Sequence, residues 1–146
     1  VAIVHVQRAD AQGNAQMWGI IGEQKEAAFA SRRVILTAEE IVDESVIRSD
    51  PNRTIIPGLI VNAVCHVPYA CHPSYAQGYY DRDNEFYFAW DKITESSSMV
   101  QDWLDEWVMN INGRDEYWNK ISPLKRKQLM ITSNLSHPVN YGHHSS

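Results

Sequence analysis

The sequence has little of what marks a membrane protein or a nucleic-acid-binding protein. No apolar run approaches the roughly 20 residues that a membrane-spanning helix needs. The net charge is −5, and the longest basic run is the KRK stretch at residues 125–127, which we interpret as a solvated helix face. We therefore expect neither a membrane nor a nucleic acid as a partner.

Cysteine is also scarce, with two residues in a chain of 146. So few cysteines are typical of a protein from a reducing compartment, and we expect a cytoplasmic location. The motifs of several enzyme classes are absent as well. The sequence has no Gly-x-Ser-x-Gly elbow, and Gly19 and Gly22 match neither a phosphate loop nor a dinucleotide fingerprint. The chain therefore shows no recognisable nucleophile or nucleotide site of its own.

The two cysteines are each followed by a histidine, at Cys65-His66 and Cys71-His72, which offers the donor atoms that zinc binds. Residues 61–67 form a predicted strand, however, and consecutive side chains of a strand point to opposite faces. The cysteines are also six positions apart, whereas zinc-binding pairs are usually closer. We therefore expect no metal site and interpret Cys65 as a small buried apolar residue. The same argument weakens a disulfide, which the sequence alone leaves open.

Two groups of carboxylates are candidates for chemistry. We interpret the acidic run at residues 39–44 as a solvated face, because its four carboxylates stand close together. Glu23 is different, since it lies at a predicted helix start after a glycine-bracketed loop, where backbone N–H groups face outward and a polar ligand could dock. Simple helix capping by Glu23 is the alternative.

The first half of the sequence predicts a strand–helix–strand unit. Residues 1–6 are a nearly continuous apolar run, as expected of a strand covered on both faces. A turn at Gly13-Asn14 follows, then helix-forming residues 23–33 that end on two arginines, and a second strand at residues 34–37. This order predicts parallel strands joined by a right-handed crossover.

The rest of the chain predicts shorter β segments and then helices. Within residues 38–53 the sequence predicts a short helix or an irregular acidic segment, which is ended by Asp50-Pro51. Two short β segments are then predicted on either side of Pro57-Gly58, where the proline marks an edge or a break. An apolar stripe predicts a helix at residues 99–108 with a capping box at Ser98 and Gln101. Further predicted elements are a helix near Asp83, a helical piece at 115–122, a helix from Pro123 after a Ser cap, and a frayed tail from residue 134.

Aromatic residues crowd the segment 75–90. Tyr and Trp side chains combine apolar bulk with a polar tip, which suits a subunit interface or the rim of a pocket. Ordinary core packing explains such a cluster equally well.

Five short motifs follow one another in order: Ala9-Asp10, Gly13-Asn14, Gln24-Lys25-Glu26, Arg33-Val34-Ile35 and His72-Pro73. As a set they resemble the second half of the alpha subunit of family I CoA-transferases, in the branch of the glutaconate CoA-transferase alpha subunit. The likeness covers roughly residues 1–94. It implies an α/β fold with a mostly parallel sheet and flanking helices.

The resemblance also implies an organisation for the chain. Residues 1–94 would be the C-terminal α/β part of an alpha subunit, residues 95–135 a helical extension, and residues 136–146 a flexible tail. Because the sequence opens within a predicted strand, we interpret the chain as a fragment of such a polypeptide.

The family moves CoA from an acyl-CoA to a free carboxylic acid. A glutamate attacks the thioester carbonyl, giving an acyl anhydride and then a glutamyl-CoA thioester, while backbone donors hold the oxyanion. In this branch the glutamate belongs to the beta subunit, and no glutamate here lies in the family's Glu-x-Gly or Ser-Glu-Asn-Gly setting. The resemblance thus implies a hetero-oligomer with a beta subunit, CoA and acyl-CoA as substrates without a covalently bound cofactor, and no catalytic residue or activity in this chain alone.

Two other functions stay open. Relatives in the same branch hydrolyse a ring-derived CoA thioester during steroid breakdown, with a needed carboxylate in the first half of the alpha subunit. The chain could instead be a non-catalytic assembly module, since it has an aromatic cluster and no nucleophile of its own.

Loops at the carboxyl ends of parallel strands are the parts expected to face a ligand. These loops are residues 9–18, after the first strand, and residues 70–80, after the strand at 61–67. Within them we expect Asn14, Gln16 and His72 to face CoA or the substrate acid, together with Glu23 at the helix start.

Overall fold

The computed structural model describes residues 1–131, and the chain divides into two compact units, Val1–Ala70 and a second unit from Cys71 onward. This division falls earlier than the boundary expected after residue 94, which rests on the resemblance and stays a prediction. Across the described residues, no helix combines the length and the apolar character needed to cross a membrane.

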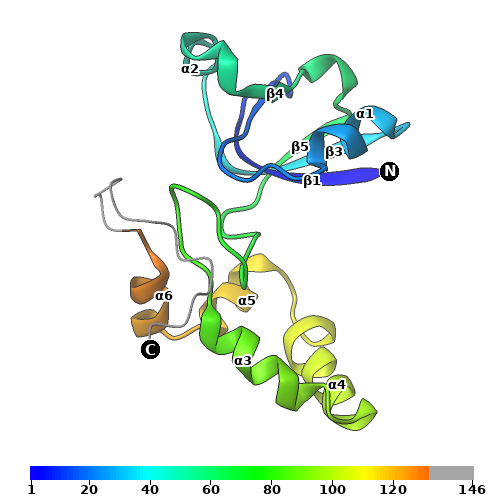
Figure 1. The fold of residues 1–146 in the computed structure, drawn as a ribbon, viewed down its shortest axis with the longest axis vertical. Helices are drawn as coiled ribbons and strands as arrows, with labels where there is room; N and C mark the ends of the chain where they lie inside the picture. Colours follow the sequence, from blue (N-terminus) through cyan, green and yellow to red (C-terminus); the bar gives the residue numbers. More distant parts are fainter. Residues whose placement is uncertain (132–146) are drawn as a thin grey trace. The chain divides into compact units, whose positions relative to one another are not determined.

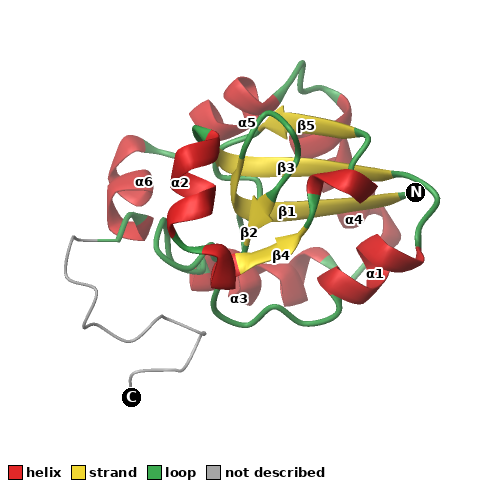
Figure 2. Ribbon diagram, turned by 90° about the horizontal axis from the view of Figure 1, so that it is seen from above, coloured by secondary structure: helices red, strands yellow, loops and turns green. Residues whose placement is uncertain are grey.

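The first unit is built on a five-stranded sheet with the strand order β4-β2-β1-β3-β5 (Figure 2). β1 and β3 are parallel, as are β3 and β5, whereas β2 is antiparallel to both β1 and β4. Four of the five strands therefore run in one direction, and the expected α/β fold with a mostly parallel sheet is confirmed. The strands are β1 Ala2–Ala9, β2 Ala15–Gln16, β3 Val34–Ile41, β4 Thr54–Ile56 and β5 Ala63–His66.

The sheet buries one face and leaves much of the other open. Along β1, Val4 and Val6 are almost fully buried, whereas Ile3 is 71% exposed. Side chains alternate between the faces of a strand, so Ala2, Val4 and Val6 share the core face, whereas further along β1 Gln7 and Ala9 are buried as well. The prediction that this strand is covered on both faces is wrong for the first half of β1, where Ile3 and His5 alternate with buried apolar residues.

The core face is covered by the helix α1, Gln24–Ala30, and by residues from the segments around β2 and β4, among them Met17 and Ile56. Glu23 is the N-cap of α1, as the predicted helix start requires. The predicted end at Arg32 and Arg33 is wrong, because Ser31 already has an extended backbone (φ −97°, ψ 145°). The two arginines therefore do not cap the helix.

After β3 the chain forms the helix α2, Glu44–Ser49, which ends at Asp50 before Pro51 as predicted. Asp43 caps α2, and hydrogen bonds from Ser45 lower the pKa of its carboxyl. Two single-turn 3-10 helices follow, η1 Pro51–Arg53 and η2 Gly58–Ile60. The predicted pair of short β segments on either side of Pro57-Gly58 is confirmed, and both strands lie at edges of the sheet.

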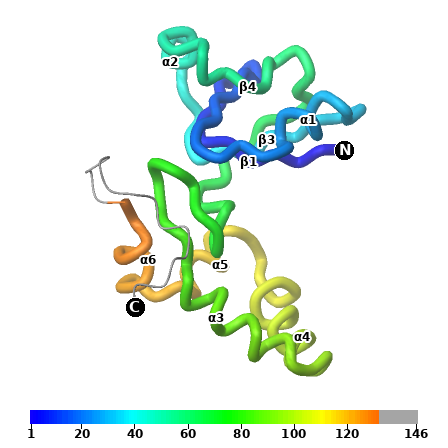
Figure 3. Tube along the Cα trace, in the orientation of Figure 1, coloured from blue at the N-terminus to red at the C-terminus, as the bar shows by residue number. Residues whose placement is uncertain are grey.

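The second unit is helical (Figures 1 and 3). The N-cap of α4 is Ser96, which accepts a hydrogen bond from Met99 N, so the predicted capping box at Ser98 is wrong by two positions. The predicted cap at Ser122 followed by Pro123 is confirmed. The tail predicted from residue 134 lies outside the described residues. The helices are α3 Asn84–Ile93, α4 Ser97–Leu104, the π-helical turn η3 Asp105–Met109, α5 Arg114–Lys120 and α6 Pro123–Leu129.

Candidate functional site

The turn after β1 is organised by a fully buried carboxylate, Asp10. Its Oδ1 accepts hydrogen bonds from Gln12 N (3.0 Å) and Asn14 N (2.9 Å), and its Oδ2 accepts one from Asn14 Nδ2 (2.8 Å). Three donors thus compensate for the loss of water around the charge. The turn at Gly13-Asn14 is confirmed, with Gly13 at a φ of 87° that favours glycine.

A second turn, at Pro57–Val61, is fastened to the first. Gly58 N donates a hydrogen bond of 3.0 Å to Asn14 Oδ1. The two backbones come so close that a Cβ on Gly58 would lie 2.2 Å from Gln12 O. Asn14, predicted to face a ligand, therefore uses its side chain to lock these two turns together.

Gln16 has a comparable structural use. It is 2% exposed, and its Nε2 donates to Ile47 O at 3.2 Å and to Asp50 O at 2.8 Å. The side chain thus ties β2 to the C-terminal end of α2. Direct contact of Gln16 or Asn14 with a substrate stays a prediction, and both residues hold the loop in place.

A pocket of about 360 Å³ lies beside this loop, within the first unit. Gln12 is one of two amide residues in its lining, and the other, Asn62, already accepts a hydrogen bond from Val34 N. The pocket combines an apolar wall with an amide, which suits a ligand of mixed character. Its lining residues are Ala11, Gln12, Ile41, Val61, Asn62, Ala63 and Val64.

The open face of the sheet carries a polar cluster that the sequence did not reveal. His5 Nδ1 lies 2.9 Å from Thr37 Oγ1, and His5 Nε2 lies 2.8 Å from Glu39 Oε1. The other carboxylate oxygen of Glu39 accepts a hydrogen bond of 2.7 Å from Tyr69 N. The Glu39 side chain is only 2% exposed, so its interpretation as part of a solvated acidic face is wrong. A histidine 34 residues away supplies its partner.

Cys65 lies on the same face, in register with Thr37 on the neighbouring strand. It is exposed, so the interpretation as a small buried residue is wrong; β5 is an edge strand, and both Cys65 and His66 are exposed there. Both cysteines are free thiols. Among residues 1–131, no three His, Cys, Asp or Glu side chains are grouped closely enough to hold a metal ion.

Glu23 stands at the beginning of α1, exposed to solvent. It occupies the N-cap position, but its side chain makes no capping hydrogen bond. Because α1 has only seven residues, the N-terminal end of this helix alone does not define an anion site. A ligand contact at Glu23 stays a prediction.

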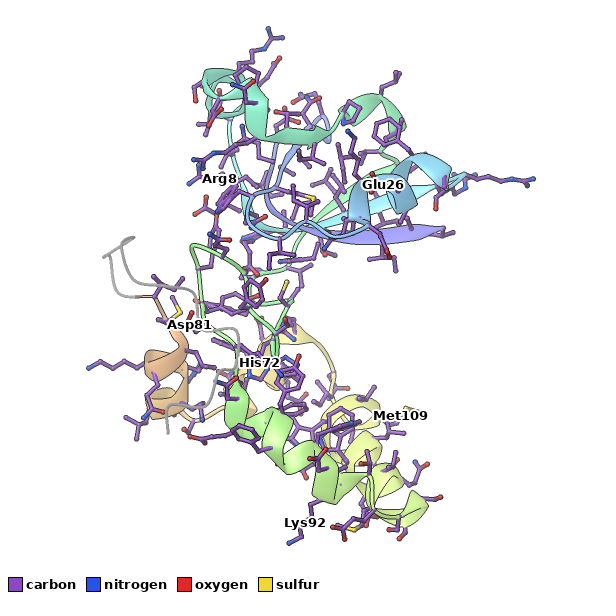
Figure 4. All side chains as sticks on the ribbon, viewed as in Figure 1. Arg8, Glu26, His72, Asp81, Lys92 and Met109 are labelled. Carbon is purple, nitrogen blue, oxygen red and sulfur yellow. The ribbon has the colours of Figure 1, made fainter. Side chains whose placement is uncertain are left out.

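His72 belongs to the second unit, where its ring is almost fully buried (Figure 4). Its Nδ1 lies 2.8 Å from Tyr117 Oη, and its Nε2 lies 3.2 Å from Asp83 Oδ2. The rings of Phe86, Tyr117 and Trp118 surround it. Both nitrogens are thus engaged inside the unit, and a substrate contact for His72 stays a prediction.

Asp83 connects this histidine to two helices. It caps α3 by accepting from Phe86 N, and Lys125 Nζ on α6 lies 3.5 Å from its Oδ1. Burial alone would raise the pKa of Asp83, but hydrogen bonds from His72 and Phe86 N and the charge of Lys125 together lower it. Burial raises the pKa of Tyr117, against the opposing charge of Arg114.

The structure therefore separates the predicted site residues. Asn14 and Gln16 lie in one loop but fasten different neighbours, Glu23 points to solvent, and His72 belongs to the second unit. The residues that sequence reasoning missed are His5 and Glu39. Polar residues recurring at every second position of β1 and β3 were the available signal.

Comparisons with known proteins give these units a context. The family model described as Coenzyme A transferase matches residues 1–66. The chain is 46% identical over 122 residues to the A subunit of 3-oxoadipate CoA-transferase from Pseudomonas knackmussii, a match that covers 84% of this chain and 43% of that protein. It is 35% identical over 140 residues to the A subunit of glutaconate CoA-transferase from Acidaminococcus fermentans, a match that covers 96% of this chain and 44% of that protein.

The fold comparison agrees with the sequence comparison. A crystal structure of glutaconate coenzyme A-transferase from Acidaminococcus fermentans matches with a TM-score of 0.84 at 35% sequence identity, covering 90% of this chain and 41% of that one. The match extends over most of the helical second unit as well as the sheet. The chain spans less than half the length of the curated relatives it matches.

Proposed function

We propose that the chain is part of the alpha subunit of a heteromeric CoA-transferase, because residues 1–66 match the coenzyme A transferase family. The observation that carries the proposal is the similarity to glutaconate CoA-transferase, with 35% identity and a TM-score of 0.84 over 90% of the chain. The enzyme would move CoA between an acyl-CoA and a carboxylic acid.

The reaction proceeds on a glutamate of the partner beta subunit. Its carboxylate attacks the thioester carbonyl of the acyl-CoA, the C–S bond breaks, and an acyl-glutamyl anhydride and CoA thiolate form. The thiolate then attacks the glutamyl carbonyl, which releases the first acid and leaves a glutamyl-CoA thioester. The acceptor acid reverses both steps with its own carboxylate, so no water and no net oxidation are required.

Three glutamates of the first unit do not suit that role. Glu39 is buried and hydrogen-bonded through both oxygens, Glu40 pairs with Arg8, and Glu44 pairs with Arg48. A nucleophile has to present a carboxylate oxygen to the thioester carbon. Because no glutamate of the chain lies in the family's Glu-x-Gly or Ser-Glu-Asn-Gly setting, this chain on its own is expected to be inactive, and CoA and acyl-CoA are substrates of the assembled enzyme.

The contribution of the chain is to hold a loop against the substrate. Asp10, Asn14 and Gly58 fix the backbone of the turn after β1, and Gln12 from that turn lines the 360 Å³ pocket. We assign to Gln12 a direct contact with the substrate, and to Asn14 and Gln16 the positioning of the loop. Glu23 and His72 remain further candidates for contact.

The cytoplasm is the location that fits this chemistry. Both cysteines are free thiols, which agrees with a reducing compartment. Acyl-CoA thioesters would be the substrates there.

The test uses the assembled heteromer, containing this chain within its full subunit and a beta subunit with a Glu-x-Gly motif. It is incubated with an acyl-CoA, with and without an acceptor acid. We expect a new acyl-CoA to form only with the acceptor, and mass spectrometry to find CoA attached to the beta subunit and not to this chain. Release of free CoA without an acceptor would instead indicate a hydrolase, and failure to find any beta partner would indicate an assembly module.

A second test concerns the loop. Gln12→Ala is expected to raise KM for the acyl-CoA several-fold, and Asn14→Ala to lower the stability of the loop as well as activity. Gln128→Ala, on the exposed side of α6, is the matched control and should change neither. Equal KM values for Gln12→Ala and the control would exclude Gln12 from substrate contact.

A further inference from the structure

The pocket beside the fastened turns has an uncharged lining. Among the described residues, those that line it are apolar except for the side-chain amides of Gln12 and Asn62. A phosphate or a carboxylate bound there would lose hydration without meeting an opposite charge, and burying an unpaired charge is costly. The volume of about 360 Å³ is within the range of small-molecule sites. The pocket therefore suits a neutral part of a substrate.

The position of the pocket favours a ligand. Ala11 and Gln12 follow β1, and Ile41 is the last residue of β3, the neighbouring parallel strand. In open α/β sheets, ligands bind at the carboxyl ends of such strands. Asp10 and the close contact with Gly58 hold the turn that contains Gln12, so this side of the pocket has a fixed shape. A preformed site of this kind binds a ligand without first having to order a loop.

Asn62, the second amide of the lining, has a fixed orientation. Its Oδ1 accepts a hydrogen bond of 2.9 Å from Val34 N on β3. A side-chain amide carries its acceptor oxygen and its donor nitrogen on separate arms, so this bond determines which way the Nδ2 group faces. Within the part of the chain that the structure describes, Nδ2 donates to no acceptor. Asn62 thus leaves an oriented donor available to a ligand.

Gln12 and the sheet edge add further groups of the same type. The exposed side-chain amide of Gln12 forms no hydrogen bond with residues 1–131. β5 lies at the end of the strand order, and alternate residues of an edge strand turn their backbone N–H and C=O away from the sheet. One of Ala63 and Val64, which line the pocket, therefore presents these groups at the edge. Such an edge forms hydrogen bonds with an extended chain of amides.

We propose that this pocket binds the pantetheine arm of coenzyme A, with Asn62 Nδ2 donating to an amide carbonyl of the arm and Gln12 bonding to a second amide. The arm is the neutral part of coenzyme A, an extended chain of amides and methylene groups, whereas its nucleotide end carries phosphates. The inference rests on the proposed transfer function and adds which part of the substrate this chain binds. Because every acyl-CoA shares the arm, the contact would act alike on all acyl groups.

Asn62→Asp in the assembled heteromer tests the assignment. The change keeps an oxygen for Val34 N and replaces only the Nδ2 donor by an acceptor. We expect KM for an acyl-CoA to rise about three- to tenfold, with kcat unchanged because the arm is bound equally in the ground state and the transition state. Urea denaturation should show an unchanged midpoint. Asn52→Asp, the same change at an exposed residue of η1 outside the pocket lining, is the matched control and should alter neither quantity.

Altered donors identify the part of the substrate that is bound. The fold-change in kcat/KM caused by Asn62→Asp should be the same for acyl-CoA substrates with different acyl groups and for an acyl-pantetheine, which lacks the nucleotide. A fold-change that depends on the acyl group would place that group in the pocket. A fold-change that is lost with the acyl-pantetheine would place the nucleotide there. Either result would overturn the proposal.

Failure of this inference and failure of the proposed function give different results. A heteromer that transfers CoA with equal KM values for Asn62→Asp and Asn52→Asp would overturn the inference alone, and would indicate that another segment of the subunit fills the pocket. A heteromer of unchanged sequence that forms no new acyl-CoA would contradict the transfer function itself, and the inference with it.

Discussion

The two units of the chain reach order by different means. In the first unit, Val34, Leu36 and Ala38 on the interior strand β3 have no exposed surface, and the core continues under α1 and the β4 segment. In the second unit, a few buried residues such as Tyr80 and Leu129, partly exposed aromatic rings and a buried polar cluster around His72 take the place of such a core. The stabilisation of a fold is roughly proportional to the apolar area that it buries, so we expect the first unit to be the more stable of the two.

This difference concerns function as well as stability. The first unit holds the fastened loop and the pocket, and the substrate wall that we propose there would have to keep its shape. In the second unit, α3 and α4 contain no buried residue. Regions with few buried contacts unfold locally at a lower free-energy cost. We therefore expect amide hydrogen exchange to be slow in β1 and β3 and faster in α4.

The largest effect should come from the centre of the first unit. Leu36→Ala removes a fully buried side chain from β3, and we expect a loss of about 2–5 kcal/mol in the free energy of unfolding. Urea denaturation, with hydrogen exchange to locate the change, measures it. Leu59→Ala, at a position 94% exposed, should change stability by less than about 0.5 kcal/mol. A small loss for Leu36→Ala would erase the contrast between the units.

Asp10→Asn should come next. The amide that replaces the carboxylate has only one acceptor oxygen. Its NH₂ group would therefore lie against the Asn14 side-chain donor or against a backbone N–H, and one hydrogen bond would be lost. We expect this loss to lower the free energy of unfolding by about 1–3 kcal/mol. The control is Asp102→Asn, whose side chain is exposed on α4. The measurement is urea denaturation with hydrogen exchange of residues 10–16. Unchanged exchange there would show that the turn does not need the charge.

In the second unit, Asp83→Ala removes the cap of α3 and the partner of His72, at an expected cost of about 1–2 kcal/mol. The pKa of Asp83 is lowered in the folded state, so its ionised form stabilises the fold at pH values above its unfolded pKa of about 3.9. That contribution is lost as the pH falls through the folded pKa. Asp83→Asn keeps a capping oxygen but cannot titrate, and should flatten the loss of stability that denaturation measures as the pH falls below about 3.9.

The smallest effect concerns the start of α4. Ser96→Ala should cost about 0.5–1 kcal/mol and speed exchange only in the first turn of that helix, because the Ser96 hydroxyl accepts from Met99 N. Ser98→Ala tests the position that the sequence pattern favoured and should be nearly neutral. If Ser98→Ala had the larger effect, the helix would begin two residues later than the structure places it.

Local patterns predicted most elements of the fold. The parallel strands β1 and β3, the N-cap at Glu23, the stop before Pro51 and the start of α6 at Pro123 all depend on residues near one another in sequence. Capping residues, proline and strand-forming runs act over a few positions, so a single sequence contains the information.

Features that depend on distant partners were not predictable in this way. Glu39 is buried beside His5 of the neighbouring strand, which forms a hydrogen bond with its carboxylate, and Cys65 is exposed because β5 lies at the edge of the sheet. The site residues have the same limitation. The sequence indicated the correct loop for Asn14, but only the fold shows that its side chain is committed to Gly58 on another turn.

The close approach of Gly58 to Gln12 has a consequence for chain length. With the two backbones in contact, neither turn has space for an extra residue unless the other moves with it. A single insertion in either turn would shift the opposing backbone out of position, whereas the exposed link between α4 and α5 has room to lengthen. Engineering that grafts a longer ligand loop onto this protein therefore has to exchange both turns together.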